Sequence, residues 1–155
     1  MIVKDILSFG GLEDAQIVAG VDGINNKVTS ATVLEVAEEK IKTWVFKNQL
    51  YITSFYAIMQ DIEMQKIVIS ALSEKKASGL VICHIDLFIK EIHPDIIKLC
   101  NKLKFPLIVA NTKRTYVEIL NPIVLKLMGN LDSQYDAVVN MQNKLIEPEL
   151  FTAIK

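Results

Sequence analysis

Polar side chains able to hold a small molecule occur where three apolar segments of the chain end. Thr53 and Ser54 follow one such segment, and their hydroxyls can both donate and accept hydrogen bonds. Glu35 ends another, and its carboxylate can accept hydrogen bonds from ring or amide N–H groups. Asn111 and Arg114 belong to a polar loop after a third segment, where the guanidinium group can hold an anion or a carbonyl oxygen. These five residues form the predicted ligand-binding set.

Each member of this set has a second interpretation that needs no ligand. A hydroxyl such as that of Thr53 or Ser54 often caps the segment that follows it. Glu35 fits a solvated charge at a strand end, and Asn111 and Arg114 fit an ordinary polar loop. The sequence leaves both interpretations open.

Metal and catalytic chemistry have weaker support. His84 and His93 have three carboxylates nearby (Asp86, Glu91 and Asp95), but their spacing matches no pattern such as two histidines on one helical face. His93 is better explained as the residue that precedes a helix. Glycine-rich phosphate loops and the nucleophile elbow of hydrolases are absent from the sequence. We therefore expect no metal, no cofactor and no catalytic residue.

The segments that position the candidate residues alternate between short apolar runs and amphipathic helices. Residues 50–54, 80–83 and 105–109 are typical of buried strands, whereas 62–76 and 94–103 have the apolar spacing of helices. This alternation predicts an α/β fold, with a mixed or mostly parallel sheet of about five strands and helices on its faces. Open sheets of this kind bind ligands at the carboxyl ends of their strands.

The first part of the chain predicts smaller elements. Residues 3–9 fit a short helix, and 16–19 and 28–35 fit strands that form a small antiparallel unit at an edge of the sheet. Residues 38–46 fit a short helix or turn with Trp44 as its apolar anchor. The two cysteines (Cys83 and Cys100) belong to no CxxC pair and are expected to be reduced thiols in the core.

The last part of the chain predicts a C-terminal helix. Asn121 and Pro122 fit a helix cap followed by a proline in the first turn. An apolar stripe then runs along the helix, and it either packs on the core of its own domain or pairs with a second copy of the chain. The residues predicted to mediate dimerisation are Val124, Leu127, Leu131, Tyr135 and Val138.

Composition limits the class of protein. The 155 residues include 17 Lys and Arg against 18 Asp and Glu, which argues against the broad basic surface that nucleic acid requires. No apolar stretch approaches the ~20 residues of a membrane span. Lys4 and Asp5 interrupt the apolar run that a signal peptide would need. We expect a cytoplasmic protein without a membrane partner.

Several short motifs occur in a fixed order along the first 125 residues. They are Val3-Lys4-Asp5-Ile6-Leu7, Ile17-Val18-Ala19-Gly20, Gly23-Ile24-Asn25, Val33-Leu34-Glu35-Val36, Leu50-Tyr51-Ile52-Thr53-Ser54, Gly79-Leu80-Val81-Ile82, Phe105-Pro106-Leu107-Ile108 and Tyr116-Val117-Glu118-Ile119. In this order they resemble the N-terminal domain of the purine catabolism regulatory protein family of bacterial transcriptional regulators. The sequence departs from that family at two places. Phe55 stands where the family usually has glycine, and Cys83-His84 stand where it tends to have a lysine.

The resemblance implies a sensory domain at residues 1–125, a linker or dimerisation helix at 126–147 and a tail at 148–155. It implies that a small metabolite, purine-related by the family's name, binds at the strand ends. Binding would shift the arrangement of the C-terminal helix and of a DNA-binding part that is missing from this chain. The alternative is a protein-interaction or dimerisation module without a ligand site, in which Phe55 plugs the usual opening. An enzyme acting on a nucleobase or ureide ranks last.

Overall fold

A computed structural model describes residues 1–35, 39–85 and 90–129 of the chain. The chain divides into two compact units, Met1–Val124 and Leu125–Lys155, and every named element lies in the first. A further helix occupies residues 116–129. The named elements are helices α1 (Val3–Ile6), α2 (Ile62–Glu74) and α3 (Pro94–Leu103), strands β1 (Gln16–Ala19), β2 (Ser30–Val33), β3 (Gln49–Thr53), β4 (Gly79–Ile82) and β5 (Leu107–Val109), and short 3-10 turns η1 (Gly10–Leu12), η2 (Val21–Gly23), η3 (Glu39–Thr43) and η4 (Tyr56–Ile58).

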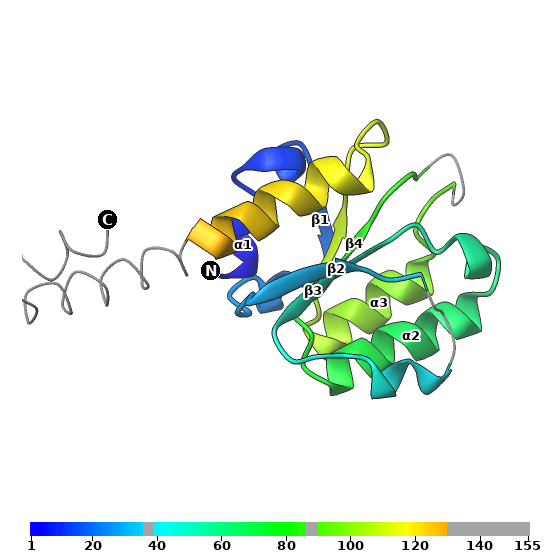
Figure 1. Ribbon diagram of the computed structural model, residues 1–155. Helices are drawn as coiled ribbons and strands as arrows, with labels where there is room; N and C mark the ends of the chain where they lie inside the picture. The colour runs from blue at the N-terminus through cyan, green and yellow to red at the C-terminus, as the bar shows by residue number, and fades with distance from the viewer. Residues whose placement is uncertain (36–38, 86–89, 130–155) are drawn as a thin grey trace, which may run out of the picture. The chain divides into compact units, whose positions relative to one another are not determined.

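The five strands form one mixed sheet in the order β1-β5-β4-β3-β2 (Figure 1). Strands β2, β3, β4 and β5 run parallel, and β1 runs antiparallel to β5. The predicted α/β fold with a five-stranded mixed sheet is therefore confirmed. The small antiparallel unit predicted near the N-terminus is wrong, because β1 and β2 lie at opposite edges of the sheet and never pair. Because both strands are short, the sequence carries no signal of which neighbouring strand each would pair with.

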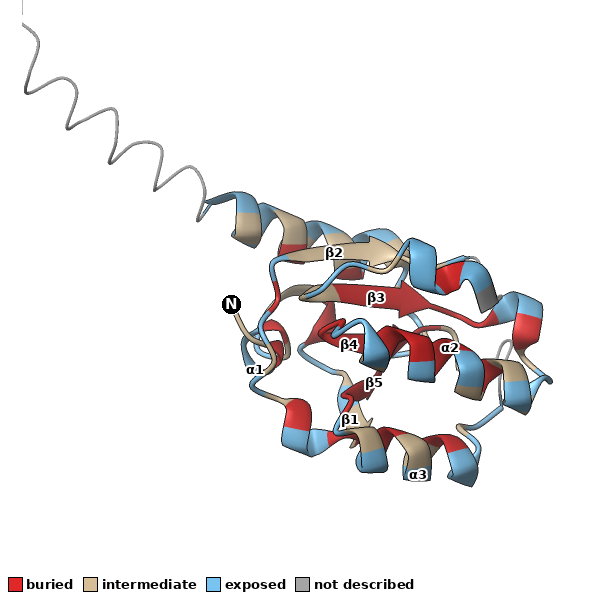
Figure 2. Ribbon diagram, turned by 90° about the horizontal axis from the view of Figure 1, so that it is seen from below, coloured by how far each residue is buried: buried red, intermediate tan, exposed pale blue. Residues whose placement is uncertain are grey.

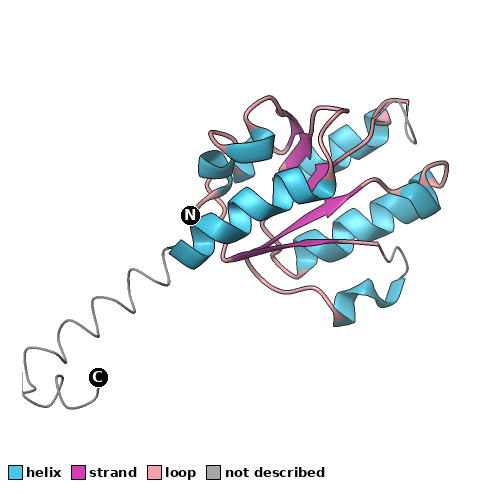
Figure 3. Cartoon of the chain, turned by 45° about the horizontal axis from the view of Figure 1, so that its top comes forward, coloured by secondary structure: helices cyan, strands magenta, loops and turns pink. Residues whose placement is uncertain are grey.

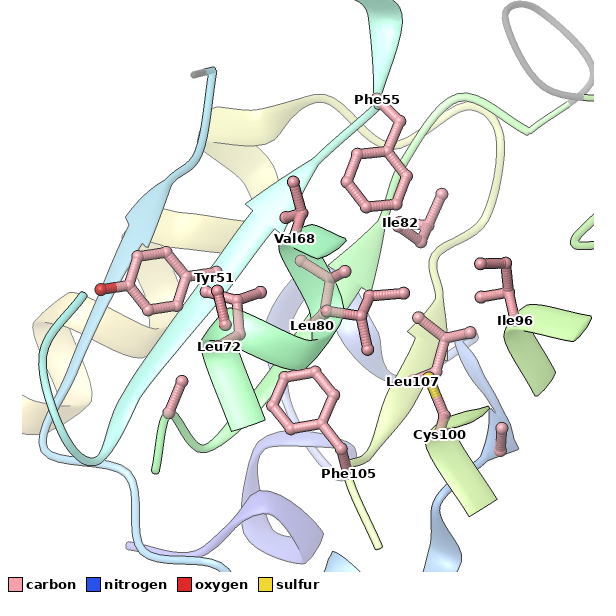
Figure 4. Close-up of a cluster of buried hydrophobic side chains, with 14 of the residues drawn as sticks. Tyr51, Phe55, Val68, Leu72, Leu80, Ile82, Ile96, Cys100, Phe105 and Leu107 are labelled. Carbon is pink, nitrogen blue, oxygen red and sulfur yellow. The ribbon is translucent and has the colours of Figure 1, made fainter. Parts of the chain in front are cut away.

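Helices α2 and α3 cover one face of the sheet. Each connects two parallel neighbours, and the connections from β3 to β4 and from β4 to β5 advance in the same direction across the sheet. Because such crossovers share one hand, both helices fall on the same side. Alternate strand residues such as Tyr51, Leu80 and Leu107 meet these helices in a buried cluster (Figure 4).

The opposite face is covered by the N-terminal segment and by the helix that begins at residue 116 (Figure 3). Leu50, Ile52 and Val81 alternate with the first set of strand residues, so they point to this face, and all are fully buried. Ile119 and Ile123 of the helix are buried as well. Figure 2 shows β4 as buried along its whole length and β3 as buried after its first residue, as expected for parallel strands packed on both sides.

Glycines allow the N-terminal segment to approach the rest of the domain at backbone distance. A Cβ atom on Gly11 would lie 2.4 Å from the Glu118 carbonyl oxygen, and one on Gly20 would lie 1.9 Å from that of Phe105. Gly20 also has a φ of +68° and donates its N–H to the Asn101 side chain at 2.8 Å. Gly20 therefore permits both the left-handed turn after β1 and the close contact with the Phe105 backbone just before β5.

The cap of the last described helix, Thr115, lies six residues before the predicted cap at Asn121. Residues 116–129 are helical, and Thr115 accepts a hydrogen bond from the Glu118 N–H at 3.3 Å as its cap. Pro122 therefore lies inside the helix, where its missing N–H leaves the Glu118 carbonyl without its usual donor. That carbonyl is the one that Gly11 approaches. The prediction failed because Asn-Pro resembles a helix start, and the capping residues Thr115 and Glu118 were not used.

Two smaller predictions have different outcomes. Trp44 is not the anchor of η3, because its side chain is 52% exposed, whereas Ile41 is fully buried. The cysteine prediction is confirmed, since both Cys83 and Cys100 are free and buried. Burial raises the pKa of each thiol to about 12, which leaves both protonated and unreactive at neutral pH. Among the described helices, none has the length and apolar character needed to cross a membrane.

Gly20 provides a test of the close approach to β5. We expect Gly20→Ala to lower the free energy of unfolding by about 2 kcal/mol or more, because a Cβ at positive φ must also displace the Phe105 backbone. Gly129→Ala is the control, since a Cβ there meets nothing within 4 Å, and it should be neutral or stabilising by up to ~1 kcal/mol. Urea denaturation of both variants measures the difference. Equal effects would contradict the contact.

Candidate functional site

A cavity of about 240 Å³ lies at the carboxyl ends of β2 and β3. Leu34 and Glu35 follow β2, Thr53 ends β3, and the start of the 116–129 helix contributes Tyr116. Three of the five residues predicted to bind a ligand, Glu35, Thr53 and Ser54, line this single hollow. The remaining lining residues are Phe55, Tyr56 and Ala57.

The hydroxyl groups of Thr53 and Ser54 differ in how many hydrogen bonds they can still make. Thr53 is 5% exposed, and its Oγ1 accepts a hydrogen bond from the Phe55 N–H at 3.1 Å, although η4, which follows Phe55, has no side-chain cap. Its hydroxyl proton is still available for donation. Ser54 is 6% exposed, and its hydroxyl has no hydrogen bond to any residue in the described parts of the chain. Toward the described residues, both the donor and the acceptor of the Ser54 hydroxyl are therefore unused.

Glu35 supplies the charge of the cavity. Of the lining residues, it alone carries a formal charge, and it makes no ion pair with a residue of the described ranges. An exposed carboxylate beside two buried hydroxyls favours a ligand that presents N–H groups on one side and hydrogen-bonding oxygens on the other. The rings of Tyr56 and Tyr116 add surfaces on which a planar group can pack.

Left-handed backbone conformations occur just past the ends of both central strands. Phe55 has a φ of +54° and His84 a φ of +59°, each two residues after its strand ends. A side chain in this region costs about 1 kcal/mol relative to glycine. Glycine, the residue that the resemblance to the family implies where this chain has Phe55, would adopt this conformation without that cost. Strain of this kind concentrates at functional sites.

The Phe55 ring is buried in the core rather than placed across the cavity. It lies beside Val68 and Ile82 in Figure 4, and the residue is 4% exposed. A hollow of about 240 Å³ remains next to it with Phe55 as one of its lining residues, and the plugging of a larger opening by this side chain stays a prediction. Burial of the ring offsets the cost of the positive φ.

His84 connects the end of β4 to the cavity wall. Its ring meets that of Tyr116 edge to face, with centroids 5.2 Å apart and an interplanar angle of 66°. The contact fixes the first residue of the 116–129 helix against a strand end. Sequence reasoning did not select Tyr116 for the site, although its position directly after the polar loop was a usable signal.

Asn111 and Arg114 lie outside this cavity. Asn111 accepts a hydrogen bond from the Lys113 N–H at 3.0 Å and lines a separate hollow beside Asp14. The Arg114 guanidinium forms two ion pairs, with 3.3 Å between its Nη2 and Asp14 Oδ2 and 3.5 Å between its Nη1 and Glu118 Oε2. The hydrogen bond to Asp14 raises the pKa of the guanidinium, which stays cationic and engaged. The physical reason is strand order, because β4 separates β5 from β3 by about 10 Å.

The residues predicted to cap a helix, to bind a metal or to mediate dimerisation lie away from the cavity or outside the described residues. His93 caps α3, with its Nδ1 accepting from the Asp95 N–H at 3.1 Å, as predicted. In the described ranges, no group of three or more metal-ligating side chains forms a cluster, and Asp86 lies outside those ranges. Val124 and Leu127 are half-buried on the 116–129 helix. Leu131, Tyr135 and Val138 lie outside the described residues, and the limits predicted at 125 and 147 stay predictions.

These features define a mixed α/β domain with a small hollow at the carboxyl edge of its parallel strands. Residues 5–127 match the purine catabolism regulatory protein-like family, and the chain belongs to this family. The resemblance drawn from the sequence motifs is confirmed, and the chain is a domain of a regulatory family.

No curated protein matches the chain. One solved structure to which it is similar is that of the CBS and DRTGG domains of the regulatory region of Clostridium perfringens pyrophosphatase, complexed with the activator diadenosine tetraphosphate. The identity is 16%, the TM-score is 0.45, and the match covers 76% of this chain and 44% of that one. The chain therefore spans less than half the length of that solved chain.

Substitutions at Phe55 can separate the stability gained by burying its ring from the cost of its positive φ. Phe55→Ala should lower the free energy of unfolding by about 3–5 kcal/mol, because it empties part of the core and keeps the positive φ. Phe55→Gly loses the same ring but relieves the backbone, so we expect it to be about 1 kcal/mol more stable than Phe55→Ala. Urea denaturation of the pair decides the point. A glycine variant less stable than the alanine variant would contradict the left-handed conformation.

Proposed function

We propose that the domain senses a small, neutral, planar metabolite in the cavity lined by Glu35, Thr53 and Ser54. The observation that carries the proposal is the convergence of these three side chains, each with hydrogen-bonding capacity left, beside two tyrosine rings. The volume of about 240 Å³ is slightly below the ~300–1,000 Å³ of typical ligand pockets, which favours a molecule the size of a nucleobase or a ureide. The family's name supports products of purine breakdown as the first candidates.

The proposed signal passes through Tyr116. This residue lines the cavity and is the first residue of the 116–129 helix, so a ligand that contacts it acts on the start of that helix. A ligand shifts a conformational equilibrium only by binding one arrangement more tightly than the other. The Tyr116 ring, already in contact with His84, is the group whose position would differ between the two arrangements. The regulated output is a DNA-binding part elsewhere in the regulator.

Thermal unfolding with a ligand panel tests the proposal. Purines, ureides such as allantoin, nucleotides and amino acids are each added at increasing concentration. A ligand at 100 times its Kd adds about 2.7 kcal/mol, which is roughly 5–10 °C in Tm for a domain of this size. Ser54→Ala should abolish the shift and leave the Tm without ligand nearly unchanged, because Ser54 makes no hydrogen bond to a described residue.

One matched pair of variants and a further control locate the site. Glu35→Gln should reduce the ligand shift, whereas Glu13→Gln, an exposed glutamate outside the cavity, should not. Arg114→Gln should also leave the shift intact, since its guanidinium is held by Asp14 and Glu118. A saturable shift that survives Ser54→Ala and Glu35→Gln would place the ligand elsewhere. No shift with any compound of the panel would remove the support for sensing at this cavity.

A second candidate function is association with a second copy of the chain through the 116–129 helix. Val117 is 61% exposed and Met128 is 52% exposed, and the spacing of Val117, Val124 and Met128 places them on one helical face. Exposed apolar residues at such spacing favour helix pairing.

Light scattering after gel filtration tests this candidate. If the chain is a dimer, Val117→Asp with Met128→Asp should convert it to a monomer, because two charges would enter the apolar contact. Lys126→Asp is the control, since it also introduces a carboxylate at an exposed position, but on the side of the same helix opposite Val117 and Met128. A monomeric unmodified chain, or a dimer that survives the double change, would show that this face is not the interface.

A further inference from the structure

A second hollow, of about 330 Å³, lies at the amino ends of the parallel strands, opposite the first. Four lysines from separate segments surround it. Lys27 precedes β2, Lys47 precedes β3, Lys76 follows α2 and Lys104 follows α3. Phe105 forms part of the wall, and Figure 4 shows its ring at the end of the core cluster away from Phe55.

The lysine charges around this hollow are not balanced locally. The hollow has no carboxylate among its lining residues, and none of its four lysines makes an ion pair with a residue in the described ranges. Elsewhere on the same helix α2, Glu74 is paired with Lys42 at 2.7 Å. The chain as a whole has a net charge of −1, so the four lysines give this hollow a positive charge that the chain as a whole does not have.

The lysines are not needed to complete the ends of the helices. At the end of α2, the carbonyls of Leu72 and Ser73 accept hydrogen bonds from the backbone N–H groups of Ala77 and Lys76 at 3.0 Å each. At the end of α3, the Cys100 carbonyl accepts from the Phe105 N–H at 2.9 Å. At both helix ends these carbonyls are therefore satisfied by backbone N–H groups and not by the lysine ammonium groups.

Backbone conformation gives an independent observation. Lys76 has a φ of +61°, Lys104 a φ of +54° and Asn48, which also lines the hollow, a φ of +63°. Glycine is the favoured residue just past a helix end in this conformation, and a longer side chain costs stability. Two helices thus end in a lysine where glycine would be more stable, and both lysines border the same hollow.

We propose that this hollow binds a small anion that carries two or more phosphate groups, such as pyrophosphate or a nucleoside diphosphate. Four ammonium groups, the Asn48 amide and the Ser73 hydroxyl can together hold several phosphate oxygens. The volume of about 330 Å³ lies within the ~300–1,000 Å³ of small-molecule sites. A small anion is favoured over nucleic acid because the lysines surround a concavity, whereas a nucleic acid backbone requires an extended basic face. The site is independent of the cavity at Glu35.

Calorimetric titration of the full chain with inorganic pyrophosphate and with ADP, at low ionic strength, tests the proposal. The key variant is Lys76→Gly with Lys104→Gly. It should weaken binding by about ten-fold or more, because two cations are lost. Its Tm should rise, because glycine fits both left-handed positions. Lower affinity with a higher Tm cannot result from a damaged fold. Lys76→Gln with Lys104→Gln removes the same charges without changing the backbone requirement, and it should weaken binding equally.

The control is Lys4→Gln with Lys113→Gln, which removes two exposed lysines away from the hollow and changes the net charge equally. It should bind both probes as the unmodified chain does. Equal weakening in the control and in the Lys76 and Lys104 variants would show a general charge effect and overturn the site. Failure of both probes to bind the unmodified chain would also overturn it. A DNA duplex that binds through Lys76 and Lys104 while pyrophosphate does not would assign the hollow to nucleic acid instead.

Discussion

Parallel pairing of β2, β3, β4 and β5 requires each strand to be reached by a connection that crosses a face of the sheet, and it requires both faces to be covered. The two helical crossovers occupy one face. The other face is left to the N-terminal segment and the 116–129 helix, which meet at backbone distance through Gly11 and the Glu118 carbonyl. The same pairing collects all parallel carboxyl ends at one edge of the sheet and all amino ends at the other.

The two edges differ chemically because different parts of the chain reach them. Strand ends and the loops after them form the carboxyl edge, where one carboxylate and two buried hydroxyls line a hollow. Helix ends and the loops before the strands form the amino edge, where lysines gather. Left-handed residues occur at both edges, Phe55 and His84 at one and Lys76 and Lys104 at the other. At each of these positions the chain has a larger side chain, although glycine would adopt the positive φ at a lower backbone energy.

Sequence reasoning succeeded where the signal was local. The runs that became β3, β4 and β5 and the apolar spacing of α2 and α3 predicted the elements. The rule that ligands bind at strand ends selected Glu35, Thr53 and Ser54, which the fold brings together in one hollow, while their binding of a ligand stays a prediction. Sequence reasoning failed where the outcome depends on strand order, which no short segment encodes. For this reason Asn111 and Arg114 were grouped with residues that lie two strands away. Trp44 failed for a related reason, since hydrophobicity alone does not say which residue of a short turn faces the core.

The sheet ends in two short edge strands, β1 and β2, of four residues each. The register of β1 against β5 shifts between Ile17 and Ala19, and β2 carries Ser30 and Thr32 among its four residues. Short edges, irregular register and polar side chains each hinder the addition of a further strand from another molecule. Fibril-like growth by backbone pairing is therefore disfavoured at both margins. Contact between copies of this domain is therefore left to surface side chains, which single substitutions can alter.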